Sequence, residues 1–141
     1  MGDFGEGEFY DPDKGTAGFN MALATLERIH VILKNCYIYS SIKEPELWHL
    51  SLLALYREVI TLIKPEEMKK YKELIEDASK QKKKLSAEIF RVKNNPKNRG
   101  SIVMTAEIYG GLQDLEITLR KIAHIKGLLM LDKEDNKNIF N

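Results

Sequence analysis

The chain has 141 residues, the length of one ordinary domain, and 43% of them are hydrophobic while 30% are charged. This balance excludes the low-hydrophobicity, high-charge composition of intrinsically disordered chains. With 22 basic and 21 acidic side chains the formal net charge is +1, which argues against a protein whose whole surface attracts nucleic acid or membrane.

The first 15 residues are predicted to form an extended, Gly-rich arm. Residues 1–13 contain five carboxylates and no Lys or Arg, and residues 11–15 form the turn sequence Asp-Pro-Asp-Lys-Gly. An acidic start is the opposite of the basic start of a signal peptide, and the single Cys36 has no partner for an internal disulfide. We therefore expect an intracellular, cytoplasmic protein.

A first helix is predicted over residues 17–40. Thr16 is a suitable N-cap because its hydroxyl can accept a hydrogen bond from a backbone N–H of the first turn. Large side chains then recur at alternating spacings of four and three, which places them along one side of a helix. They are Phe19, Leu23, Leu26, His30, Leu33 and Tyr37. This side is expected to face the core.

A second helix is predicted to begin at the capping-box sequence Ser-Ile-Lys-Glu of residues 41–44 and to end at Lys64, just before a proline. It carries two adjoining stripes of largely apolar residues. One stripe consists of Trp48, Leu52, Leu55, Val59 and Leu62, and the other of His49, Leu53, Tyr56, Ile60 and Ile63. Because only a narrow polar side is left, this helix is expected to be the most buried element. Charged residues interrupt it well before the apolar length that a membrane span requires.

A third helix is predicted to start at Pro65 almost without a preceding loop. Its one apolar side is a row at heptad spacing that includes a single lysine. The row consists of Met68, Tyr71, Ile75, Ala78, Lys82, Leu85, Ile89 and Val92. Since its other sides are strongly polar, this helix could pack on the bundle or leave it to pair with another chain. A loop is expected at residues 94–100, which are rich in Asn, Pro and Gly.

A fourth helix is predicted over residues 102–131, with Ser101 as its cap. Gly110 and Gly111 fall inside its apolar pattern, where each costs about 1 kcal/mol relative to alanine. We therefore expect either a kink or a close contact with another helix at this point. The remaining residues, 132–141, are predicted to be a polar tail.

These elements predict the fold class and the domain organisation. Short connections make neighbouring helices antiparallel. We expect an all-α antiparallel bundle of about four helices over residues 16–131, with an extended N-terminal arm at 1–15 and a C-terminal tail at 132–141.

Two of the predicted helices carry a Glu-x-x-His spacing, which supplies ligands in di-iron carboxylate bundles. The pairs are Glu27 with His30 and Glu46 with His49. If the chain turns near residue 42, however, His30 lies further from that turn than His49 does. The two histidines then differ by about 7 Å in their position along the helix axes. We expect both to be half-buried core residues, with no metal site. Because the sequence lacks nucleophile, phosphate-loop and paired-cysteine motifs, it predicts no catalytic residue, no cofactor and no small-molecule substrate.

The strongest local signal is a basic strip at residues 80–99, where eight basic residues against the single Glu88 give a local charge of about +7. Its predicted contact residues are Lys80, Lys83, Lys84, Arg91, Lys93, Lys97 and Arg99. The strip is a possible site for the phosphates of a nucleic acid. The alternatives are a solvated helix face and a docking surface for an acidic protein segment, and the near-zero net charge of the whole chain favours these over nucleic acid.

Function is predicted from these surfaces. The acidic arm offers three aromatic anchors, Phe4, Phe9 and Tyr10, for a neighbouring subunit. We expect a non-enzymatic protein that acts through contacts with a protein partner or its own copies, in a homo-oligomer or a larger assembly. Small virus-encoded proteins are often of this lysine-rich helical style, so a viral assembly is one such setting. The alternative is an accessory protein that binds nucleic acid through the basic strip. No membrane association is predicted.

Overall fold

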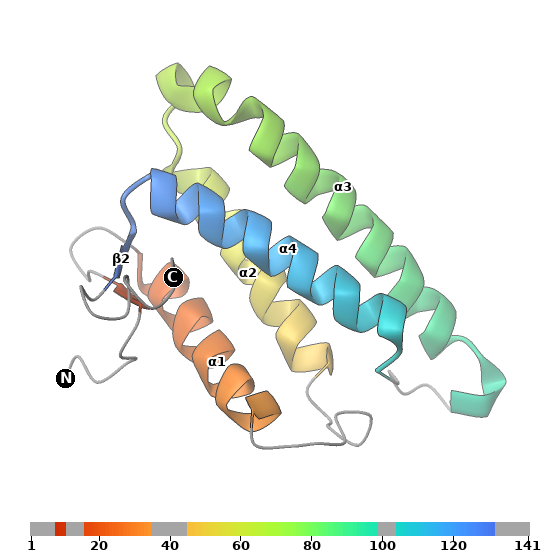
Figure 1. Cartoon of the computed structure of the whole chain (residues 1–141). Coiled ribbons are helices and arrows are strands. Elements are labelled where there is room, and N and C mark those ends of the chain that lie inside the picture. The colour runs from red at the N-terminus through yellow and green to blue at the C-terminus, as the bar shows by residue number, and fades with distance from the viewer. Residues whose placement is uncertain (1–7, 11–15, 35–44, 99–103, 132–141) are drawn as a thin grey trace, which may run out of the picture.

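The computed structural model describes residues 8–10, 16–34, 45–98 and 104–131 of the chain. Within these residues the main elements are four α-helices: α1 (Ala17–Lys34), α2 (Pro45–Leu62), α3 (Met68–Lys93) and α4 (Ala106–Ile125). Each helix runs antiparallel to the one before it, and the four pack as one bundle (Figure 1). The predicted fold class, an all-α antiparallel bundle of about four helices, is confirmed.

Helix α4 is the central element of the bundle. It packs against α3 on one side and α2 on the other, while α1 packs mainly on α2 (Figure 1). Eight residues of α4 are buried, compared with six in α2. The prediction that the second helix would be the most buried is therefore wrong. Of its two stripes, the one that begins at Trp48 faces the core, whereas most of the stripe that begins at His49 is only half-buried.

The core is a continuous apolar cluster to which all four helices contribute. Its largest fully buried side chains are Phe19, Leu26, Ile29, Trp48, Leu52, Leu55, Tyr71, Leu85, Ile108, Leu112, Leu115 and Leu119. Those of the first three helices, apart from Ile29, belong to the stripes that the sequence predicts. Among the described residues, no helix combines the length and the apolar character needed to cross a membrane.

Helix α3 stays with the bundle and packs along α4 (Figure 1). Residues of its heptad row, among them Tyr71 and Leu85, are buried. The lysine in that row, Lys82, places its Nζ 4.4 Å from the centre of the Tyr56 ring on α2. This cation–π contact lets a charged residue occupy a position that faces the bundle.

The start of the first helix agrees with the sequence, whereas the fourth helix is shorter than predicted. Thr16 accepts a hydrogen bond of 3.0 Å from the backbone N–H of Phe19, as expected of an N-cap. The fourth helix is capped by Thr105, whose hydroxyl accepts from the N–H of Ile108, and not by Ser101. It ends at Ile125, because Gly127 adopts a positive φ of 82° that stops the helix. The capping-box residues 41–44 lie outside the described part of the chain.

Two short strands close one end of the bundle. Strand β1 (Glu8–Tyr10) pairs antiparallel with β2 (Leu129–Leu131), with Phe9 opposite Met130. Neither strand was predicted. Residues 129–131 are predicted from the sequence as the end of a helix because Leu129 follows Ile122 by seven residues and so fits the same apolar side.

Candidate functional site

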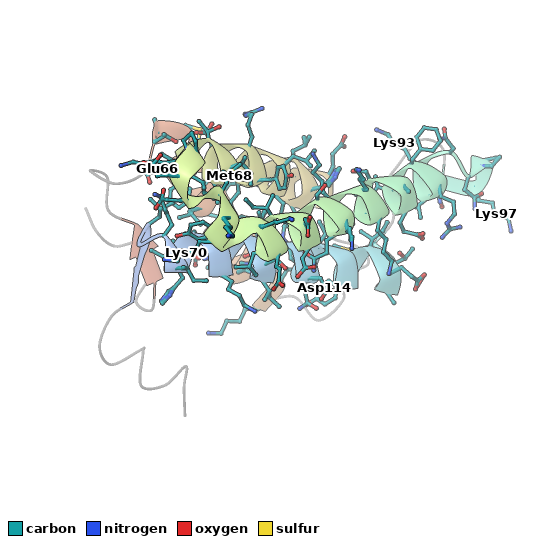
Figure 2. The ribbon with its side chains drawn as sticks, turned by 90° about the horizontal axis from the view of Figure 1, so that it is seen from above. Glu66, Met68, Lys70, Lys93, Lys97 and Asp114 are labelled. Atoms are coloured by element: carbon teal, nitrogen blue, oxygen red, sulfur yellow. The ribbon has the colours of Figure 1, made fainter. Side chains whose placement is uncertain are left out.

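The basic strip lies on α3 and the turn that follows it. The six described residues among its predicted contacts are all exposed: Lys80, Lys83, Lys84, Arg91, Lys93 and Lys97. Arg99 lies outside the described residues. Lys93 and Lys97 project at the C-terminal end of α3 (Figure 2). These six side chains thus lie on the surface, whereas Lys82 of the same segment packs on Tyr56 of α2.

Part of the charge of the strip is neutralised locally. Arg91 forms an ion pair with Glu88, one turn earlier on α3. The Nζ of Lys93 lies 3.8 Å from a carboxylate oxygen of Glu46 on α2. No described carboxylate lies within salt-bridge distance of the other four members, Lys80, Lys83, Lys84 and Lys97.

The segment that carries the strip also contains an exposed aromatic residue, Phe90. The side chain of Phe90 on α3 is 70% exposed, although phenylalanine is normally buried. The sequence contains a signal for this exposure, because Phe90 falls outside the heptad row that contains Ile89 and faces the core.

The predicted anchors of the arm are divided. Phe9 and Tyr10 belong to β1, which pairs with β2 of the same chain. Phe4 lies outside the described residues. A part of the arm is therefore held by its own bundle through backbone hydrogen bonds.

The two Glu-x-x-His pairs do not come together. Glu46 points toward Lys93 on α3, and the Nε2 of His49 is buried without a hydrogen-bond partner among the described residues. Glu27 and His30 instead face α4. Both histidines are half-buried, as predicted. The described residues contain no group of three or more His, Cys, Asp or Glu side chains that could hold a metal ion.

The most distinctive polar feature is a buried carboxylate, Glu116 on α4, whose side chain accepts three hydrogen bonds. Its residue is only 4% exposed. The Nε1 of Trp48 donates to Oε1 at 2.8 Å, and the Nε of Arg120 donates to Oε2 at 2.8 Å. The Nε2 of His30 lies 2.6 Å from the same Oε2. Arg120 also donates to Glu27 at 3.0 Å, so α1, α2 and α4 meet in one polar cluster.

Burial and charge shift the pKa values of this cluster. The pKa of His30 is raised, mainly by its hydrogen bond to Glu116. The negative charges of Glu116 and Glu27 raise it further, while burial acts in the opposite direction. Burial raises the pKa of Glu27, and burial lowers the pKa of Arg120 to about 10. With Arg120 and His30 both protonated, the two carboxylates are balanced by two cations.

Glu27, His30 and Trp48 belong to patterns predicted from the sequence, whereas Glu116 and Arg120 belong to none of them. One signal was present: Glu116 follows Leu112 by four residues and so falls on the apolar side of its helix, and Arg120 follows after another four. The atoms of Glu116 are engaged with donors from three helices. The cluster is therefore suited to fixing how these helices pack.

Two of the surface hollows lined by described residues contain glycines. One, of about 310 Å³, lies between α1 and α2; its lining residues are Gly18, Met21, Ala22, Thr25, Leu50, Ser51, Ala54 and Arg57. The other, of about 330 Å³, lies between α3 and α4 around Gly110 and Gly111, and carries the acidic residues Glu88, Glu107 and Asp114. Asp114, labelled in Figure 2, lines this second hollow from α4. We refer to the first hollow as the α1–α2 groove.

Comparisons of the chain with protein-family models, with curated proteins and with solved structures gave no match. Its function is therefore argued from its own surfaces.

Proposed function

We propose that this chain is a non-enzymatic helical protein that works through protein–protein contacts, and that its α1–α2 groove binds the same groove of a second copy. The observation that supports this is a pair of exposed apolar side chains that line the groove together with small residues. Met21 on α1 is 70% exposed and Leu50 on α2 is 54% exposed.

The groove has the features of a self-complementary contact. Its lining combines small residues, among them Gly18, Ala22 and Ala54, with the exposed side chains of Met21 and Leu50. A two-fold-related copy could place its own Met21 against these small residues, so the same surface would supply both the protruding and the receiving side chains. Methionine is well suited to such a place because its flexible side chain adapts to irregular surfaces.

Charge at the groove is also compatible with this partner. Arg57 is exposed at the edge of the groove, and Glu58, its neighbour on α2, lies close enough for an ion pair of 4.0 Å. A two-fold contact would bring both charges near their counterparts in the second copy. Such a contact at the rim would favour correct orientation more than it would add affinity.

The test is the solution mass as a function of protein concentration. We expect the parent to exceed the mass of the 16.2 kDa protomer and Met21→Lys and Leu50→Lys to reduce it toward that of one protomer at unchanged helicity. Ile117→Lys is the matched control, because Ile117 is an exposed apolar residue on α4 outside the groove. A parent that is monomeric at high concentration, or equal effects of all three variants, would show that the groove is not the contact.

The arm enters the proposal as a second contact. Its carboxylates and Phe4 could bind the basic strip of a neighbouring copy when no nucleic acid occupies that strip, since the two carry opposite charge. Deleting residues 1–7 leaves β1 and its pairing in place. We expect this deletion to keep the helical content and to lower the mass further at low protein concentration. An unchanged assembly would remove the arm from the proposal and leave the groove unaffected.

A further inference from the structure

We infer that the outward face of the C-terminal half of α3 binds single-stranded nucleic acid, with the Phe90 ring stacking on a base and the surrounding lysines contacting phosphates. This surface lies on α3, and the inference does not depend on the α1–α2 groove. It rests on the conjunction of an exposed aromatic ring with unpaired positive charge.

The ring is the first part of the argument. Phe90 is 70% exposed, although burial of a phenylalanine side chain normally stabilises a fold. On an α-helix, Lys83 and Ala87 precede it by seven and three residues and therefore lie on the same side. Because Ala87 is small, it leaves the ring accessible from the direction of Lys83.

The charge is the second part. Lys80, Lys83 and Lys97 are exposed, and no described carboxylate lies within salt-bridge distance of them. The acid nearest in sequence to the ring, Glu88, is already paired with Arg91. Lys83 lies about 10 Å along the helix axis before Phe90, while Lys97 follows in the turn Pro96–Asn98. Cations thus lie on both sides of the ring.

These two features select among the possible partners. Phosphates would bind to the lysines through the release of counterions, which any polyanion can provide. A ring on the outside of a helix adds a specific requirement, because it can stack only on a base that is not already stacked in a duplex. A single strand satisfies both requirements, whereas an acidic protein segment or a duplex satisfies only the first.

The test is fluorescence anisotropy at low salt with labelled oligothymidine and oligouridine of about 15 nucleotides, a length that covers a typical single-strand site. We expect saturable binding to at least one of them. Phe90→Ala should weaken it by about 5- to 100-fold, the range that loss of one base–aromatic stack produces. Phe90→Trp should retain it. Lys83→Gln and Lys97→Gln should each reduce the slope of log K against log salt by about 0.7.

The controls lie on the same helix and at an equally apolar position. Lys69→Gln and Lys72→Gln change exposed lysines near the N-terminus of α3, away from Phe90. Ile117→Ala changes an exposed apolar residue on α4. All three should bind within about twofold of the parent, a difference of less than 0.5 kcal/mol.

Three results would overturn the inference. The first is the absence of binding to either oligonucleotide at low salt. The second is equal affinity for a duplex of the same length, because the ring could not stack in a duplex. The third is an unchanged affinity of Phe90→Ala, which would leave only non-specific attraction. Preferential binding of an acidic peptide would assign the strip to a protein partner instead.

Discussion

The indole Nε1 of Trp48 donates a 2.8 Å hydrogen bond to Oε1 of Glu116, which lies 68 residues later in the chain. This bond joins α2 to α4 inside the core. The ring of Trp48 also packs edge-on against the rings of His30 and Tyr109, at centroid distances of 5.5 and 5.7 Å. The packing of three helices therefore depends on the side chains that surround one buried carboxylate.

Neutralising that carboxylate should destabilise the protein. The Glu116 carboxylate accepts hydrogen bonds from Trp48 and Arg120. In Glu116→Gln the amide has only one acceptor oxygen for these donors, and Arg120 would lose part of its counter-charge. We expect the free energy of unfolding to fall by about 3 kcal/mol. Chemical denaturation monitored by circular dichroism measures this change. Asp114→Asn, an exposed change on the same helix, should alter it by less than about 0.5 kcal/mol.

Stability should depend on pH through His30. Since the pKa of His30 is raised above its ordinary value of 6.5 in the fold, protonated His30 stabilises the native state. This contribution is complete below pH 6.5 and is lost as the pH rises through the higher folded value. The free energy of unfolding should therefore fall as the pH rises above 6.5 and through the raised folded pKa of His30. Denaturation curves at several pH values measure it.

His49 provides the opposite control. Burial lowers its pKa below 6.5, so its contribution to stability is present above that pH and is lost as the pH falls. His30→Gln should remove the decline on the alkaline side, while His49→Gln should leave that decline in place. If both variants kept the parent's alkaline decline, another group would be responsible for it.

Two leucines of α2 should respond differently to truncation. Leu55 is fully buried, whereas Leu47 on the same helix is 48% exposed. Leu55→Ala should lower the free energy of unfolding by about 2 to 5 kcal/mol, because it removes buried methyl groups and leaves a cavity. Leu47→Ala should change it by about 0.5 kcal/mol or less. Equal losses in thermal melts would mean that α2 does not pack as described.

The two adjacent glycines of α4 should also differ. A Cβ added at Gly111 would lie 3.0 Å from the Cδ1 of Leu85 on α3, whereas one added at Gly110 would meet nothing within 4 Å. Gly110→Ala should thus stabilise the helix by about 1 kcal/mol. Gly111→Val should cost about 1 to 3 kcal/mol, because the buried Leu85 would have to move. A stability gain for both variants would contradict the close helix contact.

This close contact is one of the two outcomes that the sequence predicted for the glycine pair. The pattern of Gly110 and Gly111 indicated that something unusual happens there, and it could not say which residue faces a neighbour. Only the packing of α3 on α4 assigns that role to Gly111, because helix rotation and register depend on all the side chains of both helices.

The sequence by itself determined the fold class and most of the core. Apolar periodicity, the cap at Thr16 and the proline after Lys64 act within a few residues of each other, so they can be read locally. The sequence also identified the basic strip, because charge is a local property. Tertiary structure alone decided that α4 and not α2 is central, that Phe90 is exposed beside unpaired lysines, and that Glu116 joins His30, Trp48 and Arg120. These features depend on contacts between residues far apart in the chain, and no single helix contains the information that sets them.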